Sequence, residues 1–241
     1  MKKEDVIHLL KSPDFSQRLN SWKRVPFHKT LNHLISALCS EDEEVKWHAV
    51  TATGFLVSTL AAVDLEGARN IVRRMIWSLN EESGGVGWGI PEALGEILAR
   101  NETLAHEFAP LLVSYIQPGD NFFNFEPLRR GVLWAVGRAA QTRPELLRSL
   151  GAGDALLPFL KSGDAGVRGV AAWGLGQLRD EQGLSGLARL LPDRETVQIY
   201  LEGRLRFFPI NRLAEEAMEK ISKGPVSPTD RGMGEEEPGL D

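Results

Sequence analysis

The chain has 241 residues, of which 42% are hydrophobic and 25% are charged, and its formal net charge is −5. This size suits one domain or two small ones with a substantial core, and this composition excludes a fibrous protein and a membrane protein. The acidic balance argues against a general nucleic-acid binder, and the single cysteine excludes a disulfide framework and a cysteine-based zinc site.

The first 26 residues are expected to cap one end of the fold. A short helix is predicted at about residues 3–11, followed by a turn that begins at Ser12-Pro13-Asp14. The apolar stretch at residues 6–10 is too short for a signal peptide, and no apolar run reaches the roughly 18 residues of a membrane span. The sequence therefore predicts a cytoplasmic protein without a membrane partner.

An internal repeat organises the rest of the chain. Four segments align without gaps, at spacings of 41, 42 and 39 residues, and they begin at Val45, Val86, Leu128 and Val167. Each carries a glycine nine positions after its start, at Gly54, Gly95, Gly137 and Gly176. A weaker fifth copy begins at Ile210.

Apolar or small residues recur within each segment at intervals that share one face of a helix. An amphipathic stretch precedes each segment, at residues 28–39, 67–79, 104–117, 152–161 and 182–191. Each period therefore predicts two antiparallel helices that bury their apolar faces against neighbouring pairs. The expected repeats form one domain over residues 1–221 and span about residues 27–62, 66–100, 104–142, 145–180 and 181–221.

The segment from Val167 to Leu178, introduced by Ser162-Gly-Asp-Ala-Gly, resembles the second helix of a HEAT repeat. It is similar, more narrowly, to the HEAT-like repeats named after phycobilisome lyases, whose pattern is Val-Arg-x-x-Ala-Ala-x-Ala-Leu-Gly-x-Ile. The first three segments depart from this pattern; in the second, Gly87 stands in place of the arginine and Pro91 interrupts. The resemblance covers roughly residues 27–221 and implies an all-α fold, a right-handed α-solenoid of about five helical hairpins. It says little about function, because such solenoids serve many roles.

Residues 196–210 form an insertion in the last repeat. Two runs with alternating apolar residues, 197–201 and 205–207, flank Glu202-Gly203. A period of two on both sides of such a turn predicts a β-hairpin. The favoured interpretation is a cap that closes the apolar edge of the last repeat, and the alternative is a strand on which a partner docks.

Residues 222–241 hold five acids and two bases, are rich in glycine and proline, and are expected to form a disordered acidic tail. The remaining body is close to neutral, with an acidic first half and a slightly basic second half. The argument against a nucleic-acid partner therefore depends on the lack of a basic stripe and not on net charge.

A second stripe on the repeated helices points away from the core and, in a HEAT solenoid, lines the concave surface. Four of the six tryptophans fall on it. Tryptophan and arginine are typical anchors of protein interfaces. A partner-binding stripe is therefore predicted at Trp47, Trp88, Glu92, Glu96, Arg130, Trp134, Arg138 and Trp173. Alternatively, the rings pack over the repeat glycines between adjacent helices, and the charged residues form ion pairs between repeats.

A glycine-rich turn precedes the second repeated helix, with Pro91 at the first turn of that helix. Its glycines are Gly84, Gly85, Gly87 and Gly89. Such a turn can offer N–H groups to an anion, but no strand precedes it and no Gly-Lys-Ser/Thr follows, which excludes the common nucleotide-binding motifs. We interpret it as a turn with a recognition role. Three phenylalanines in the loop 117–126 are expected to fill the space beside it, and the alternative is an exposed apolar lip that binds a partner.

No catalytic constellation stands out. Only His106-Glu107 resembles the His-Glu pairs of the iron-binding HEAT-repeat hydroxylases, and a single pair cannot close a coordination sphere. His48 is expected to be a satisfied core histidine and Cys39 a buried small hydrophobe. We therefore predict no catalytic residues, no metal and no cofactor.

The favoured function is a non-enzymatic scaffold or interaction module that binds a protein or peptide through its concave face. The lyase resemblance implies an alternative, a chaperone-like lyase or cofactor-handling protein for a flat acidic ligand such as a tetrapyrrole. A HEAT-like DNA glycosylase is a third hypothesis, because Trp134 between Arg130 and Arg138 is similar to what such a site needs. The nearly neutral body weighs against nucleic acid.

Overall fold

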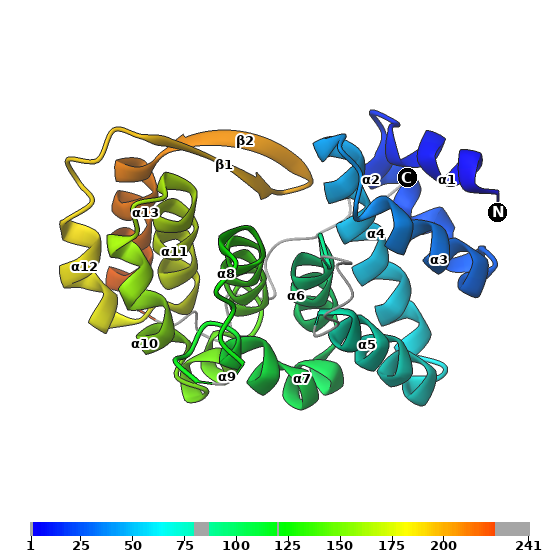
Figure 1. Cartoon of the computed structure of the whole chain (residues 1–241), viewed down its shortest axis with the longest axis horizontal. Helices are drawn as coiled ribbons and strands as arrows, with labels where there is room; N and C mark the ends of the chain where they lie inside the picture. The colour runs from blue at the N-terminus through cyan, green and yellow to red at the C-terminus, as the bar shows by residue number, and fades with distance from the viewer. Residues whose placement is uncertain (1, 80–86, 120, 225–241) are drawn as a thin grey trace, which may run out of the picture.

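Two rows of helices build the molecule, and a β-hairpin crosses one side of the inner row (Figure 1). The computed structural model describes residues 2–79, 87–119 and 121–224. The inner row consists of α4 (Glu43–Ala61), α6 (Ile90–Arg100), α8 (Glu126–Ala140), α11 (Ala165–Leu178) and α13 (Ile210–Ser222). The outer row consists of α3 (Phe27–Ala37), α5 (Leu65–Leu79), α7 (Glu102–Ser114), α9 (Pro144–Ser149), α10 (Ala152–Leu156), the 3₁₀-helix η2 (Leu157–Lys161), η3 (Glu181–Gly183) and α12 (Leu184–Ala188).

A short N-terminal unit packs against α3 and α4. It consists of α1 (Lys3–Leu10), α2 (Phe15–Arg18) and the 3₁₀-helix η1 (Leu19–Arg24). His48 on α4 joins this unit to the repeats, because its Nδ1 lies 2.6 Å from the carbonyl oxygen of Leu10 and its ring stacks on Phe15. This is the satisfied core histidine that the sequence predicts.

The repeat glycines set the spacing of the inner helices. A Cβ atom added to Gly95 on α6 would lie 2.5 Å from the Cα atom of Ala135 on α8, and one added to Gly176 on α11 would lie 2.7 Å from the Cα atom of Ala217 on α13. Real Cβ atoms do not approach backbone so closely, so a glycine is needed wherever two inner helices touch in this way. The glycine therefore recurs in each repeat because neighbouring inner helices pack closely at that position.

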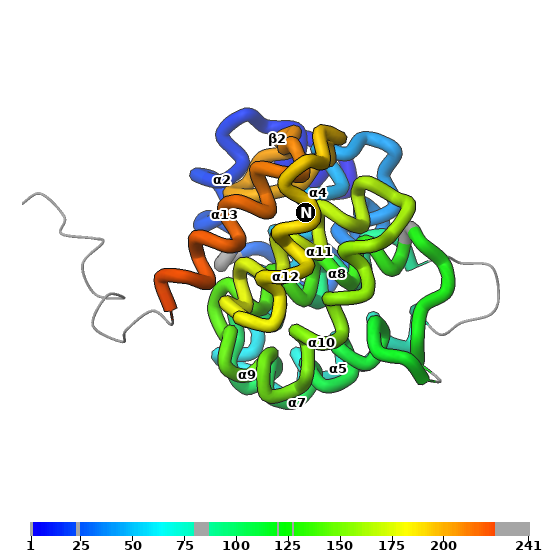
Figure 2. Tube along the Cα trace, turned by 90° about the vertical axis from the view of Figure 1, so that its left-hand side faces the viewer, coloured from blue at the N-terminus to red at the C-terminus, as the bar shows by residue number. Residues whose placement is uncertain are grey.

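The inner helix α6 is almost completely enclosed. On α6, all residues from Ile90 to Ala99 are buried, including the two charged ones. Neighbouring inner helices cover both flanks, the outer row covers one face, and the hairpin lies on the opposite face, as the two perpendicular views agree (Figures 1 and 2).

The hairpin consists of β1 (Thr196–Leu201) and β2 (Arg204–Pro209), which pair antiparallel. Glu202 and Gly203 both have positive φ angles, 52° and 76°, as a tight two-residue hairpin turn requires. The predicted hairpin is confirmed, and so is the all-α solenoid into which it is inserted. Its base contacts α11, where Val197 packs on Gly169. Its tip reaches across the inner row to α4, where Tyr200 meets Thr51.

Some sequence predictions are wrong or fall outside the described residues. Cys39 is exposed, not buried, because α3 ends at Ala37 and the side chain lies in the turn beyond it. The predicted tail 222–241 begins inside α13, and residues 225–241 lie outside the described part. Within the described ranges, no helix has both the length and the apolar character needed to span a bilayer.

Candidate binding site beside the hairpin

The predicted concave stripe is mostly covered. Trp47, Trp134 and Trp173 retain 8%, 3% and 5% of their accessible surface, whereas Trp88 retains 38%. The ring of Trp173 lies over Gly137, as the packing interpretation expects. Of the four stripe tryptophans, Trp88 alone is therefore exposed.

The hairpin occupies the groove that the stripe lines. The indole Nε1 of Trp134 donates a hydrogen bond of 3.0 Å to the carbonyl oxygen of Tyr200, and Arg130 Nη2 donates one of 3.2 Å to the carbonyl oxygen of Gln198. Trp47 stacks on the ring of Tyr200, and Thr51 Oγ1 lies 3.0 Å from its hydroxyl. Side chains of the stripe thus hold the main chain of β1 as a groove would hold an extended peptide.

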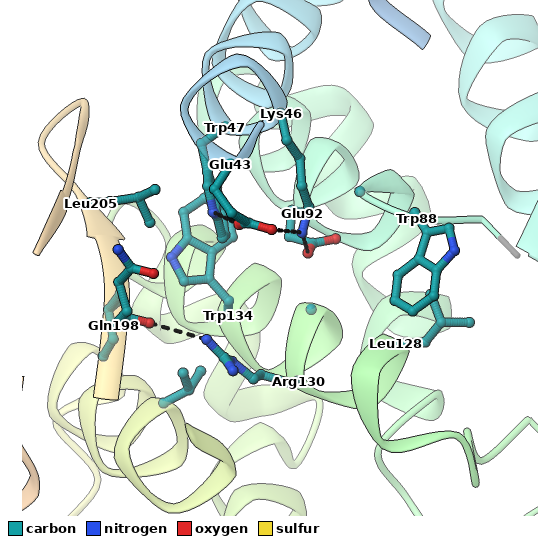
Figure 3. Close-up of a pocket in the computed structure, with 14 residues that line it drawn as sticks. Glu43, Lys46, Trp47, Trp88, Glu92, Leu128, Arg130, Trp134, Gln198 and Leu205 are labelled. Atoms are coloured by element: carbon teal, nitrogen blue, oxygen red, sulfur yellow. Dashed lines mark hydrogen bonds and ion pairs between the residues drawn. The ribbon is translucent and has the colours of Figure 1, made fainter. Parts of the chain in front are cut away.

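A cavity of about 370 Å³ remains on one flank of the hairpin (Figure 3). Its walls come from α4, the start of α6, α8 and the hairpin, and its main lining residues are Glu43, Lys46, Trp88, Glu92, Leu128, Arg130, Gln198 and Leu205. Figure 3 shows the side chains of Glu43, Lys46 and Glu92 close together, with Trp88 across the cavity beside Leu128.

Glu92 is a buried carboxylate on this cavity. Among the described residues, its ion-pair partner within 4.0 Å is Lys46, whose Nζ lies at that limit and also pairs with Glu43 at 3.6 Å. Gly131 on α8 makes room for the carboxylate, because a Cβ atom there would lie 2.8 Å from Glu92 Oε2. Burial raises the pKa of Glu92, and Lys46 opposes that shift only in part. A buried carboxyl group with a raised pKa on a cavity is a candidate for ligand recognition.

Trp88 forms the mouth of the cavity. Its ring meets that of Phe125 edge to face, with centroids 5.7 Å apart, and Phe125 is also exposed. The loop phenylalanines were expected to fill space, and the other two do: Phe123 stacks on Tyr115 and Phe122 on Phe159. These two rings therefore pack on the end of α7 and on η2.

The glycine-rich turn holds the start of α6 in place. Gly89 has φ 72°, and a Cβ atom there would lie 2.9 Å from both Cβ and the carbonyl oxygen of Leu38, so this glycine serves a turn and a close backbone contact. Gly87 packs near Leu79. Gly84 and Gly85 lie outside the described residues, and a recognition role for the turn stays a prediction.

A second cavity, of about 400 Å³, lies on the other flank of the hairpin and contains a neutralised carboxylate. Glu96 accepts hydrogen bonds of 3.0 Å from Arg138 Nε and from Arg100 Nε. The pair with Arg138 joins two repeats, as the ion-pair interpretation of the stripe expects. Glu96 therefore has its cations in place, whereas Glu92 does not.

Three important residues of this region were not predicted as site residues: Lys46, Glu43 and Tyr200. Phe125 belongs to the loop for which an apolar lip was the alternative interpretation. The helical period places Lys46 and Glu43 beside the stripe, but it does not show that they meet Glu92 on the next repeat. Tyr200 comes into contact only because the hairpin crosses the groove, which no local pattern reveals.

No protein-family model matches the chain. A protein of Archaeoglobus fulgidus, described only as uncharacterized, is 32% identical over 108 residues, or 45% of this chain and 52% of the relative. The chain thus matches about half the length of that relative.

Solved structures share the fold at low sequence identity. An engineered protein from the Northeast Structural Genomics Consortium superposes with a TM-score of 0.54 at 18% identity, over 93% of this chain and 98% of that one. A designed armadillo repeat protein in complex with the peptide (KR)4 superposes with a TM-score of 0.52 at 18% identity, over 92% of this chain and all of that one. The chain is a helical repeat protein with an armadillo-like fold.

Proposed function

We propose that the chain is a peptide-binding repeat module and that the cavity beside the hairpin receives a basic side chain of its partner. One observation carries this proposal: Glu92 is a buried carboxylate on an open cavity, with its nearest cation 4.0 Å away. A lysine or arginine side chain that entered would supply the missing partner and stabilise the ionised form.

The surroundings of Glu92 suit the same kind of ligand. The exposed ring of Trp88 at the mouth offers a π face to a cation, and the aliphatic stem of a lysine or arginine would pack beside Leu128. Arg130 also lines the cavity and donates to the carbonyl oxygen of Gln198, and its charge stabilises the ionised form of Glu92 less than that of Lys46 does. A solved relative in fold carries a (KR)4 peptide, so a basic partner is compatible with this architecture.

Electrostatics favour this ligand over the alternatives. Glu43 and Glu92 would repel the carboxylates of a tetrapyrrole, which the likeness to phycobilisome-lyase repeats would imply, and the phosphates of a nucleic acid. A cationic side chain meets Lys46 and Arg130 in the same lining, but Lys46 is already paired with Glu43 and Arg130 with a main-chain carbonyl oxygen, which leaves Glu92 as the charge without a close partner.

The test uses the peptide (Lys-Arg)4 as a probe and isothermal titration calorimetry on the full chain. Glu92→Gln should weaken binding by about tenfold or more, because a charge-assisted contact is lost while the shape of the side chain is kept. Trp88→Ala should also weaken binding, because the cation loses its aromatic contact.

Two matched variants control for the loss of one negative charge and for the loss of one exposed aromatic ring anywhere on the surface. Glu102→Gln removes the same charge from an exposed position at the start of α7, and Trp77→Ala removes an exposed ring from α5. Both should bind the peptide as the wild-type chain does. Equal weakening by Glu102→Gln and Glu92→Gln would contradict the proposal, since the peptide would then be responding only to net charge.

A further inference from the structure

The two edges of the hairpin have different surroundings. Leu201 and Arg204 flank the two-residue turn as a hydrogen-bonded pair, so the main-chain groups of Gln198 and Tyr200 point outward from β1. Arg130 and Trp134 on α8 donate to these two outward carbonyl oxygens. The edge of β1 is therefore seated on the inner helices.

The same register leaves the outer edge of β2 open. The main-chain groups of Leu205 and Phe207 point outward, and among the described residues no hydrogen bond beyond the hairpin reaches them. In Figure 1, β2 forms the margin of the molecule above β1, on the side away from the helices. Open strand edges are places where another extended chain can add as a strand.

The side chains of β2 define what could pair there. Arg204 and Arg206 share one face, are both exposed, and are the charged residues of the strand. Arg206 has a weak, exposed ion pair with Glu202, at 3.5 Å. On the other face, Phe207 exposes 71% of its surface next to Leu205. A partner strand with acids on one face and apolar residues on the other would match both faces.

We propose that the outer edge of β2 binds an extended acidic segment of a partner protein as a third strand. Main-chain hydrogen bonds to Leu205 and Phe207 would supply the pairing, and carboxylates opposite Arg204 and Arg206 would select the sequence. A second copy of this chain is disfavoured, because two β2 strands would bring four arginines together. The chain's own acidic run, Glu235-Glu236-Glu237, follows Gly232 and Gly234 and precedes Pro238 and Gly239, a composition that is unfavourable for strand pairing.

The experiment uses the full chain and two synthetic peptides, acetyl-(Glu-Val)4-amide and acetyl-(Lys-Val)4-amide. The acidic peptide should bind at least about tenfold more tightly at low salt, and added salt should weaken it. NMR-detected amide exchange should show new protection of Leu205 and Phe207 when the acidic peptide is bound. The amide of Arg206 already faces β1, so its protection should change little.

Variants separate strand pairing from charge attraction. Phe207→Pro removes one outward N–H group without touching the pairs between β1 and β2, and it should abolish the protection of Leu205. Arg204→Glu should reverse the preference between the two peptides, whereas Arg73→Glu, on exposed α5, should not.

Three results would overturn the proposal: equal affinity for the two peptides, acidic-peptide binding without protection of the Leu205 and Phe207 amides, or protection of these amides in the chain alone. The last result would show that a second copy or the chain itself already covers the edge. Leu205 also lines the cavity, but the strand proposal depends on main-chain groups of β2 and an acidic probe, whereas the cavity proposal depends on Glu92 and a basic probe. Failure here therefore leaves the cavity proposal intact.

Discussion

Glu92 and Glu96 lie one turn apart on α6 and are both buried, yet they face different cavities on the two flanks of the hairpin. Arg100 and Arg138 neutralise Glu96 at 3.0 Å, while Lys46 approaches Glu92 only to 4.0 Å. The i, i+4 spacing predicts their shared helix face and also the pair of Glu96 with Arg100 on the same helix, but Arg138 and Lys46 come from other repeats. Because Glu96 is already neutralised by two arginines, Glu92 is the carboxylate that a cationic ligand can still pair with.

The two glutamates should respond oppositely to substitution by glutamine. Because the folded pKa of Glu92 is raised above 4.5, the folded state favours the protonated form, and stability is lost as pH rises from about 4.5 through the folded pKa. Glu92→Gln should therefore be at least as stable as the wild-type chain at pH 7, with an advantage that vanishes below the unfolded pKa. Urea unfolding at pH 4 and pH 7 measures this difference.

Glu96→Gln provides the contrast. It weakens three charge-assisted hydrogen bonds, one from Arg100 and two from Arg138, and leaves Arg138 poorly compensated, so a loss of about 1–3 kcal/mol is expected at pH 7. If Glu92→Gln lost stability to a similar extent at pH 7, Glu92 would be as well paired as Glu96, and the electrostatic basis of the proposed site would fail.

At the scale of the helices, the repeat glycine is the residue of the sequence pattern that sets how closely neighbouring inner helices pack. Gly95→Ala raises the helix propensity of α6 by up to about 1 kcal/mol, but its Cβ atom would lie 2.5 Å from the backbone of Ala135. Overpacking against a neighbouring backbone costs roughly 1–3 kcal/mol and should prevail, so the variant should unfold at lower urea concentration. Gly183→Ala, where the nearest atom is 3.5 Å away, is the control and should be neutral. Equal stability of Gly95→Ala and the wild-type chain would show that α6 and α8 can move apart enough to accommodate the added methyl group.

The helix pairs and the hairpin could be predicted because their signals are local. The repeat spacing located α4, α6, α8 and α11, and the alternation around Glu202-Gly203 located β1 and β2. The burial of the stripe could not be predicted in the same way. Trp134 is covered by a main-chain contact with Tyr200, 66 positions away, and Thr51 meets the same tyrosine across 149 positions. Periodicity within one helix says nothing about such contacts.

At the scale of the whole molecule, the hairpin changes how the repeats are coupled. In a solenoid each repeat contacts its neighbours only, so stability is a sum of local terms. Here Tyr200, inserted in the last repeat, stacks on Trp47 and meets Thr51 on α4, at the other end of the inner row. The first and last repeats therefore share one contact region, and we expect the chain to unfold more cooperatively than an open row of helices.

Tyr200→Ala should break this link while leaving the base of the hairpin attached, because Arg168 on α11 still pairs with Asp193 at 3.0 Å. Loss of a large buried ring typically costs about 3–5 kcal/mol, and here the loss should fall on the contact with α4. Hydrogen exchange should therefore accelerate in α4 more than in α13, and tryptophan emission should shift to the red as the stripe becomes hydrated. Phe207→Ala, an exposed ring on the same hairpin, is the control and should change neither signal. Equal acceleration in α4 and α13 would mean that the hairpin adds only local packing, because a link between the ends must release one end when it is cut.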